Sequence, residues 1–339
     1  MKHSNDPISK DMFEIEPATT LDNEIIAKPQ LSFAKDAWLR VRKNKAAIVS
    51  AVLLLLVIIM AFVGPSLSHF DPYQQDVTKT NLPPRIPGIE KLGILDGSQK
   101  IGGVEQNVYE QNNIKEYYWF GTDSLGRDLF SRVWVGTRVS LYIALLAAVI
   151  DMLIGVMYGL VSGFRGGKVD NVMQRVLEVI SGIPNLIVVI LMLLILKPGI
   201  ISITIAMVIT GWVGMARVVR GQVLKLKNQE YILASRTLGA KNNRLLFRHL
   251  LPNLSGVIII NTMFTIPSAI FFEAFLSFIG IGLQAPQASL GTLIEDGYKT
   301  FQFLPHLMII PSIVICIILI TTNLIGDGLR DAFDPKMRD

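Results

Sequence analysis

The chain has 339 residues, of which 51% are hydrophobic and 17% are charged, against roughly a quarter charged in soluble proteins. Together with a mean hydropathy of +0.46, this excludes an ordinary soluble globular protein. The net charge of +5 does not indicate nucleic-acid binding, because the Lys and Arg residues lie between apolar runs without interleaved aromatic residues. The single cysteine, Cys316, excludes an intrachain disulfide and a multi-cysteine metal site.

The N-terminal part predicts a tail followed by a first membrane span. Residues 1–34 are polar and carry no period that could bury a face, which is typical of a flexible cytoplasmic tail. Residues 35–64 contain a basic flank and an apolar run at 46–63, long enough to cross ~30 Å of hydrocarbon. A signal peptide is disfavoured, because no small-residue cleavage site closely follows this run.

Further apolar runs predict an all-α polytopic membrane protein with six transmembrane helices in total. The runs are 139–161, 172–196, 200–219, 254–281 and 304–325, and the last five spans form a core at 136–328. Their interiors include Gly155, Pro184, Gly211 and Pro267, which membrane helices tolerate when neighbouring helices satisfy the freed backbone groups.

The distribution of Lys and Arg predicts the orientation. One side collects the basic stretch before the first span, the residues at 165–175, those at 217–248, and a C-terminal tail at 329–339. The short loops on the other side hold only Lys197 and Lys299. Both termini are therefore expected in the cytoplasm.

The long outer loop, residues 65–135, ends in "WFGTDSLGRDLFSRVWVGTRVSL". A helix from about Ser124 would place Leu125, Leu129 and Val133 on one stripe and polar residues opposite. This predicts an amphipathic helix on the outer membrane face, capped by Asp123 or Thr122, with an irregular loop as the alternative. The polar and turn-forming residues that mark the segment are Gly121, Asp123, Gly126, Arg127 and Asp128.

The stretch "EYILASRTLGAKNNRLLFRHLLPN", residues 230–253, is charged although it separates two apolar runs. Residues 231–238 favour a helix in which Ser235 and Gly239 share a face beside Ala234. Such a small face lets another surface approach closely, and Gly239 can end the helix in a left-handed cap. A basic surface loop with no partner is the alternative.

A second short helix is expected after Gly239. Lys241, Arg244 and Arg248 would form a basic face toward lipid headgroups, and Pro252 suits the first turn of the next span. The segment is therefore predicted to be a helix-turn-helix on the cytoplasmic membrane surface.

The residues of this stretch resemble those of a known family. The run "ASRTLGA…LP" is similar to the coupling loop of ABC importer permeases, here residues 221–252, whose short helix docks into a groove on the ATPase subunit. The resemblance implies docking residues and a loop end, which are Tyr231, Ala234, Ser235, Leu238, Gly239, Ala240, Leu251 and Pro252. The sequence departs from the pattern with Leu233 at the acidic position and Ser235 at the second alanine; Glu230, one turn earlier, could supply the charge.

Two further segments narrow the resemblance. "GTDSLGRDLFSRVWVGTRVSL" and "FFEAFLSFIGIGLQAPQASLG" resemble the C-type permease of oligopeptide, dipeptide and nickel importers, over most of residues 35–335. The resemblance implies a type I importer fold in a prokaryotic plasma membrane. It also implies a heterodimer with a B-type permease, two ABC ATPase subunits and an extracytoplasmic binding protein. Peptide and nickel substrates stay open, and a secondary transporter or channel is the alternative of a different class.

The chain itself offers no ATP site. Its glycine-rich segment "SGFRGGKVD" has Ser162 and Val169 where a phosphate loop needs a glycine and a Ser or Thr. The four histidines have no metal-ligand spacing. We therefore expect a non-catalytic subunit that binds no cofactor or metal, with ATP and magnesium in the partner ATPases.

Two carboxylates are candidates for the pathway or for helix packing. Asp151 lies near the middle of the second span, where a charge costs on the order of 3 kcal/mol, so it should face protein or water. It could serve a cavity or subunit contact, a structural hydrogen bond, or substrate. Glu273 lies near the outer end of the fifth span, where it could line an outer gate or fix the following turn.

Overall fold

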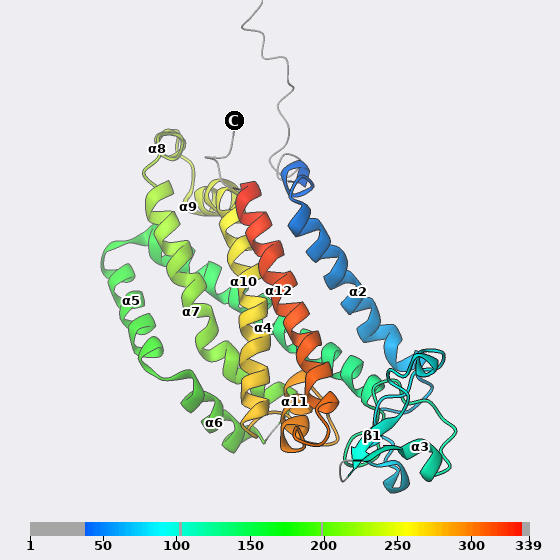
Figure 1. Cartoon of the computed structure of the whole chain (residues 1–339). Helices are drawn as coiled ribbons and strands as arrows, with labels where there is room; N and C mark the ends of the chain where they lie inside the picture. The colour runs from blue at the N-terminus through cyan, green and yellow to red at the C-terminus, as the bar shows by residue number, and fades with distance from the viewer. Residues whose placement is uncertain (1–37, 102–103, 198, 334–339) are drawn as a thin grey trace, which may run out of the picture.

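A computed structural model describes residues 38–101, 104–197 and 199–333 (Figure 1). The predicted tail at 1–34 and residues 334–339 of the predicted C-terminal tail lie outside the described residues. The long helices are α2 (Lys45–Leu67), α4 (Leu129–Arg165), α5 (Gly167–Gly182), α6 (Asn185–Leu196), α7 (Ile200–Leu226), α10 (Leu251–Phe278) and α12 (His306–Phe333). The all-α polytopic fold is thus confirmed, apart from a small hairpin of β1 (Ser98–Ile101) and β2 (Val104–Asn107).

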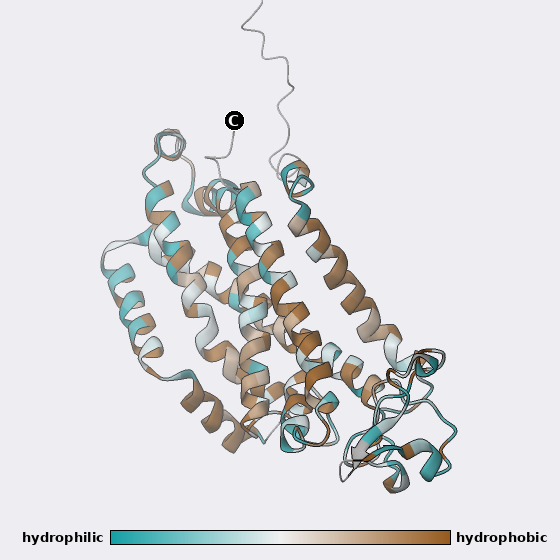
Figure 2. Cartoon of the chain, in the orientation of Figure 1, coloured by the Kyte–Doolittle hydropathy of each residue, from teal (hydrophilic) through white to brown (hydrophobic). Residues whose placement is uncertain are grey.

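Within the described ranges, five helices are long and apolar enough to cross a membrane, and α5 with α6 passes the same test as a pair. The span predicted at 172–196 corresponds to this pair, which bends by 78° between Gly182 and Asn185. Pro184 has no N–H for a helix, and it forces Ile183 into extended backbone (φ −89°, ψ 120°). Figure 2 shows that α6 is apolar throughout, whereas α5 is largely polar.

The expected amphipathic helix on the outer face does not form. Asp128 is the N-cap, its Oδ2 accepting from the Ser131 backbone N at 2.9 Å, and α4 then runs without interruption to Arg165. Asp123 and Thr122 therefore do not cap it. Arg127 and Asp128, expected on an exposed polar face, are 3% and 2% exposed. Leu129 and Val133 of the predicted stripe lie in the first turns of α4 and are buried, whereas Leu125 precedes the helix and is 37% exposed.

The closest packing in the core joins α4 to α7 along a line of glycines. A Cβ at Gly155, Gly159 or Gly163 would meet atoms of α7 at 2.6, 2.5 and 2.9 Å respectively. These glycines recur every four residues, so they share one face and let the two backbones approach. The interface therefore depends on the absence of side chains at these positions.

The outer loop folds into a small subdomain of its own. Leu82, Tyr109, Ile114 and Tyr118 form its core, and the hairpin packs beside the short helix α3 (Val108–Gln111). It also includes the single turns η3 (Val77–Lys79) and η4 (Ile89–Leu92).

One cation stiffens this subdomain. The Arg85 guanidinium lies 4.6 Å from the Tyr117 ring centroid and 5.2 Å from that of Tyr109. Its Nε donates to Glu90 Oε2 at 2.8 Å, and this hydrogen bond holds the pKa of Glu90 below its ordinary value. The stacked cation and its carboxylate partner join the η4 turn to the segment that leads into α4.

The two ends of the bundle differ. Figure 1 places α8 (Glu230–Thr237) and α9 (Asn242–Arg244) at the same end as the start of α2 and the end of α12. The outer subdomain lies at the opposite end, beside α11 (Leu290–Lys299). The start of α2, the end of α12 and α8 therefore share one end of the bundle, and the placement of that end in the cytoplasm stays a prediction.

Candidate functional site

The helix expected at 231–238 is present as α8, and most of it faces outward. Leu238 is 88% exposed, and Tyr231 and Leu233 are 42% and 46% exposed. Ala234 and Gly239 are also exposed, whereas Ser235 and Ala240 are partly buried. Gly239 has φ +82°, the left-handed conformation predicted for it, and a Cβ there would meet no atom within 4 Å. The helix thus presents small and apolar residues with space around them.

One buried side chain and one cation–π contact attach α8 to the bundle. Of its eight residues, all in the described part of the chain, only Ile232 is buried, at 0% exposure. It packs in an apolar cluster that includes Leu160 of α4, Val219 of α7 and Leu254 of α10. The Arg236 guanidinium lies 5.8 Å from the Phe164 ring centroid, a cation–π contact with the inner end of α4. The sequence analysis missed both residues, although Ile232 lies one helical turn before Ser235 and so borders the small face on its buried side.

The second helix expected in the loop is continuous with the next membrane helix. α9 is followed directly by a π-helical turn, η5 (Leu245–Leu250), and then by α10, with Pro252 in its first turn as predicted. Lys241, Arg244 and Arg248 are exposed, as expected for a face toward headgroups. Leu251 is partly buried against the cluster that holds Ile232.

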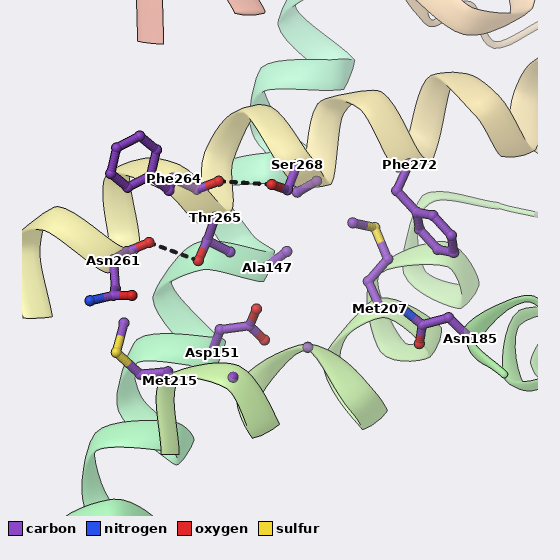
Figure 3. A pocket seen from close by; sticks show the side chains of 13 residues that line it. Ala147, Asp151, Asn185, Met207, Met215, Asn261, Phe264, Thr265, Ser268 and Phe272 are labelled. Carbon is purple, nitrogen blue, oxygen red and sulfur yellow. Dashed lines mark hydrogen bonds between the residues drawn. The ribbon is translucent and has the colours of Figure 1, made fainter. Parts of the chain in front are cut away.

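A cavity of about 440 Å³ lies between α4, α7 and α10, with the first residue of α6 at its margin. Figure 3 shows the Asp151 carboxylate in the space between α7 and α10. Asp151 is 6% exposed, and its Oδ1 has no hydrogen-bond partner among the described residues. The thirteen residues that line the cavity are Ala147, Asp151, Asn185, Met207, Gly211, Gly214, Met215, Asn261, Phe264, Thr265, Ser268, Ala269 and Phe272.

Glu273 does not line this cavity. It is fully buried and accepts from Ser140 Oγ at 2.9 Å and from Ser277 Oγ at 2.8 Å. The Ser140 hydroxyl also accepts from the Leu290 backbone N at 3.3 Å, so the network joins α4, α10 and α11. These contacts favour the reading in which Glu273 fixes the turn after the fifth span over the reading in which it lines an outer gate.

The residues 121–128 form a tight turn before α4. The Asp123 carboxylate accepts from Arg127 Nε at 2.7 Å and pairs with Arg132 Nε at 3.3 Å. Gly121 (φ +80°) and Gly126 (φ +73°) occupy left-handed positions, where a Cβ would overlap the backbone of the outer subdomain. These residues therefore hold the subdomain on the outer end of α4, a packing role instead of the expected membrane-surface role.

The structure is thus a bundle of membrane helices with an exposed short helix between two of them. Residues 155–339 match the family of binding-protein-dependent transport system inner membrane components, and residues 32–84 match the N-terminal transmembrane domain of oligopeptide transport permease C. The chain belongs to this permease family, as the resemblance predicted.

Two relatives that match this chain over nearly its whole length are also transport permeases. The oligopeptide transport system permease protein of Bacillus subtilis is 45% identical over 98% of this chain and 99% of its own. The dipeptide transport system permease protein of Lactococcus lactis is 47% identical over 97% and 98%. A solved inward-facing methionine ABC transporter shares the fold with a TM-score of 0.50 and 18% identity, over 59% of this chain and 96% of that one.

Proposed function

We propose that the chain forms half of the transmembrane pathway of an ATP-driven peptide importer. The relatives described above are named for oligopeptide and dipeptide transport, which supports peptides over the nickel alternative. The other half would come from a B-type permease, and an extracytoplasmic binding protein would deliver the peptide. Membership of this family also favours ATP-driven import over a secondary transporter or channel.

In this proposal the chain is non-catalytic, and two ABC ATPase subunits hold the ATP and magnesium. It lies in the plasma membrane of a prokaryote, with both termini and α8 in the cytoplasm. ATP binding would draw the ATPase subunits together, and each would move a short helix of the permease that it grips. A docked helix transmits force only when its docking differs between the two states of the transporter.

The observation that supports this role best is the two-sided character of α8. Its buried Ile232 ties it to three membrane helices, while Leu238 at 88% exposure and the open surface at Gly239 offer a contact for another protein. An exposed apolar helix on a basic surface is typical of a docking element.

Crosslinking tests this contact directly. In a Cys316→Ser background, Ser235→Cys should crosslink to the ATPase subunit in membranes, whereas Val104→Cys on the outer hairpin should not. Val104 is 60% exposed, so it is a matched accessible control at the other end of the molecule. Absence of any crosslink from position 235 would contradict the proposal.

Substitution of Gly239 tests whether this face couples ATP hydrolysis to peptide uptake. Gly239→Arg should leave the complex assembled and ATP hydrolysis measurable but abolish peptide uptake, because a long side chain fills the approach surface. Gly239→Asn is the control, since Asn adopts the left-handed conformation more readily than other residues and adds little bulk. Unchanged uptake by the arginine variant in membrane vesicles would refute the docking role of this face.

A further inference from the structure

The polar atoms that line the Asp151 cavity are mostly hydrogen-bond acceptors. Asn261 Nδ2 donates one of its two hydrogens to the Val257 carbonyl at 2.8 Å, so its Oδ1 and one N–H are left for a ligand. The single hydroxyl hydrogens of Thr265 and Ser268 are donated to carbonyls of their own helix at 3.1 and 2.9 Å. These hydroxyl oxygens can therefore only accept from a ligand. The side-chain donors that remain are the second amide hydrogen of Asn261 and the amide of Asn185 at the margin, whose Oδ1 accepts from Thr210.

The carboxylate itself has no counter-charge within the cavity. None of the thirteen lining residues, all in the described part of the chain, is basic. Asp151 Oδ1 has no partner there, although the side chain is more than nine-tenths buried. A buried polar group without a partner is costly in a membrane segment, and such groups mark functional positions.

The cavity wall is built around this carboxylate. A Cβ at Gly211 of α7 would lie 2.6 Å from Asp151 Oδ2, so only glycine leaves the carboxylate its present place. On the opposite wall, α10 contributes Phe272, whose ring can contact a cation favourably. The volume of about 440 Å³ accommodates a small charged group together with water.

We infer that this cavity receives the ammonium group of a peptide in transit, with Asp151 as its counter-charge. An ammonium offers three donors and no acceptor, which complements a carboxylate surrounded by acceptor oxygens. The inference rests on the proposed peptide import and deepens it by naming the recognised group. The ammonium can be the free amino terminus or a lysine side chain, and both present the same chemistry.

The test is ATP-driven uptake by the complete importer in proteoliposomes, for wild type and Asp151→Asn. The substrates are trialanine, N-acetyl-trialanine and N-acetyl-Ala-Lys-Ala, with rates expressed per loaded binding protein so that its own preference cancels. Loss of one charge-assisted hydrogen bond should lower the trialanine rate about tenfold relative to N-acetyl-trialanine. The acetylated lysine peptide shows whether the cavity also binds a side-chain ammonium. If it does, the uptake rate of this peptide falls in Asp151→Asn together with that of trialanine.

Two further variants separate recognition from folding. Gly211→Ala pushes the carboxylate aside and should reduce the same ratio, while Glu178→Gln removes an exposed carboxylate on α5 and should change nothing. Equal rates of wild type and Asp151→Asn on all peptides would overturn the inference. So would an equal loss on free and acetylated peptides, which indicates helix packing or a basic residue of the neighbouring permease. A wild-type importer that moves none of the peptides with ATP would instead refute the proposed function.

Discussion

The attachment of α8 to the bundle yields the sharpest mechanical prediction, the effect of Ile232→Ala. A helix of eight residues is marginal by itself in water, so its position depends on tertiary packing. Ile232 is its one buried side chain and is fully enclosed by residues from α4, α7 and α10. Truncating a buried isoleucine to alanine costs about 3 kcal/mol, within the usual 2–5 kcal/mol.

That cost falls on docking of α8 more than on the fold of the membrane bundle, because the bundle keeps its own contacts. A loss of about 3 kcal/mol raises the undocked fraction of α8 roughly a hundredfold. Amide hydrogen exchange at residues 230–238 should accelerate accordingly, and the importer should hydrolyse more ATP for each peptide imported. ATP turnover itself should persist, since the ATPase subunits are unaltered.

Leu233→Ala is the matched control for hydrogen exchange. It is also on α8, but Leu233 is 46% exposed, so its truncation removes little packing against the bundle. Protection of α8 should then stay close to that of wild type. If Ile232→Ala left both the exchange at 230–238 and the ATP-to-peptide ratio unchanged, the buried side chain would not be the mechanical link.

Two other predictions follow from packing and charge. Gly159→Ala should destabilise the bundle by about 1–3 kcal/mol, because its Cβ would lie 2.5 Å from the Ala216 carbonyl oxygen, a backbone atom that cannot turn away. Gly221→Ala is the control, since a Cβ there would meet open space. The melting temperatures of both variants in detergent measure the difference. At the outer subdomain, the lowered pKa of Glu90 beside Arg85 gives stability that is complete above the ordinary pKa of 4.5 and is lost as the pH falls through the lowered value. Tyrosine fluorescence of the subdomain should report this acid transition, and Glu90→Gln should remove it; an unchanged transition in that variant would exclude this pair as its cause.

The parts of the fold that the sequence predicted are those fixed by local composition. Apolar runs set the membrane helices, and the small residues from Ala234 to Gly239 set α8 and its left-handed end. The signal for the break at Pro184 was also local, because Gly182 and a proline two residues later commonly end a helix. The apolar residues on both sides of Pro184 nevertheless favour one continuous span, which is why the sequence analysis expected no break there.

Other features could not be read from periodicity. Arg127 and Asp128 have the charge pattern of an exposed face, yet Arg127 is buried against Asp123 and Asp128 caps α4. Their polar partners are local, but the segment that covers them is distant in the sequence, because the backbone of Asp76 packs against Leu125 and Gly126. The cavity is hidden from periodicity as well, since it depends on how α4, α7 and α10 pack around Asp151.

The continuity of α4 joins these sites into one mechanical element. Its 37 residues span about 55 Å without a proline, so a displacement at one end is carried to the other with little bending. Its outer end meets the subdomain through Arg132 and Asp123, its inner end meets α8 through Phe164 and Arg236, and Asp151 lies between them. Asp151 contacts the same helix, α7, that the glycine line approaches. A shift of α4 along α7 therefore changes the surroundings of the carboxylate directly, so that force on α8 and release of a bound ammonium group act through one interface.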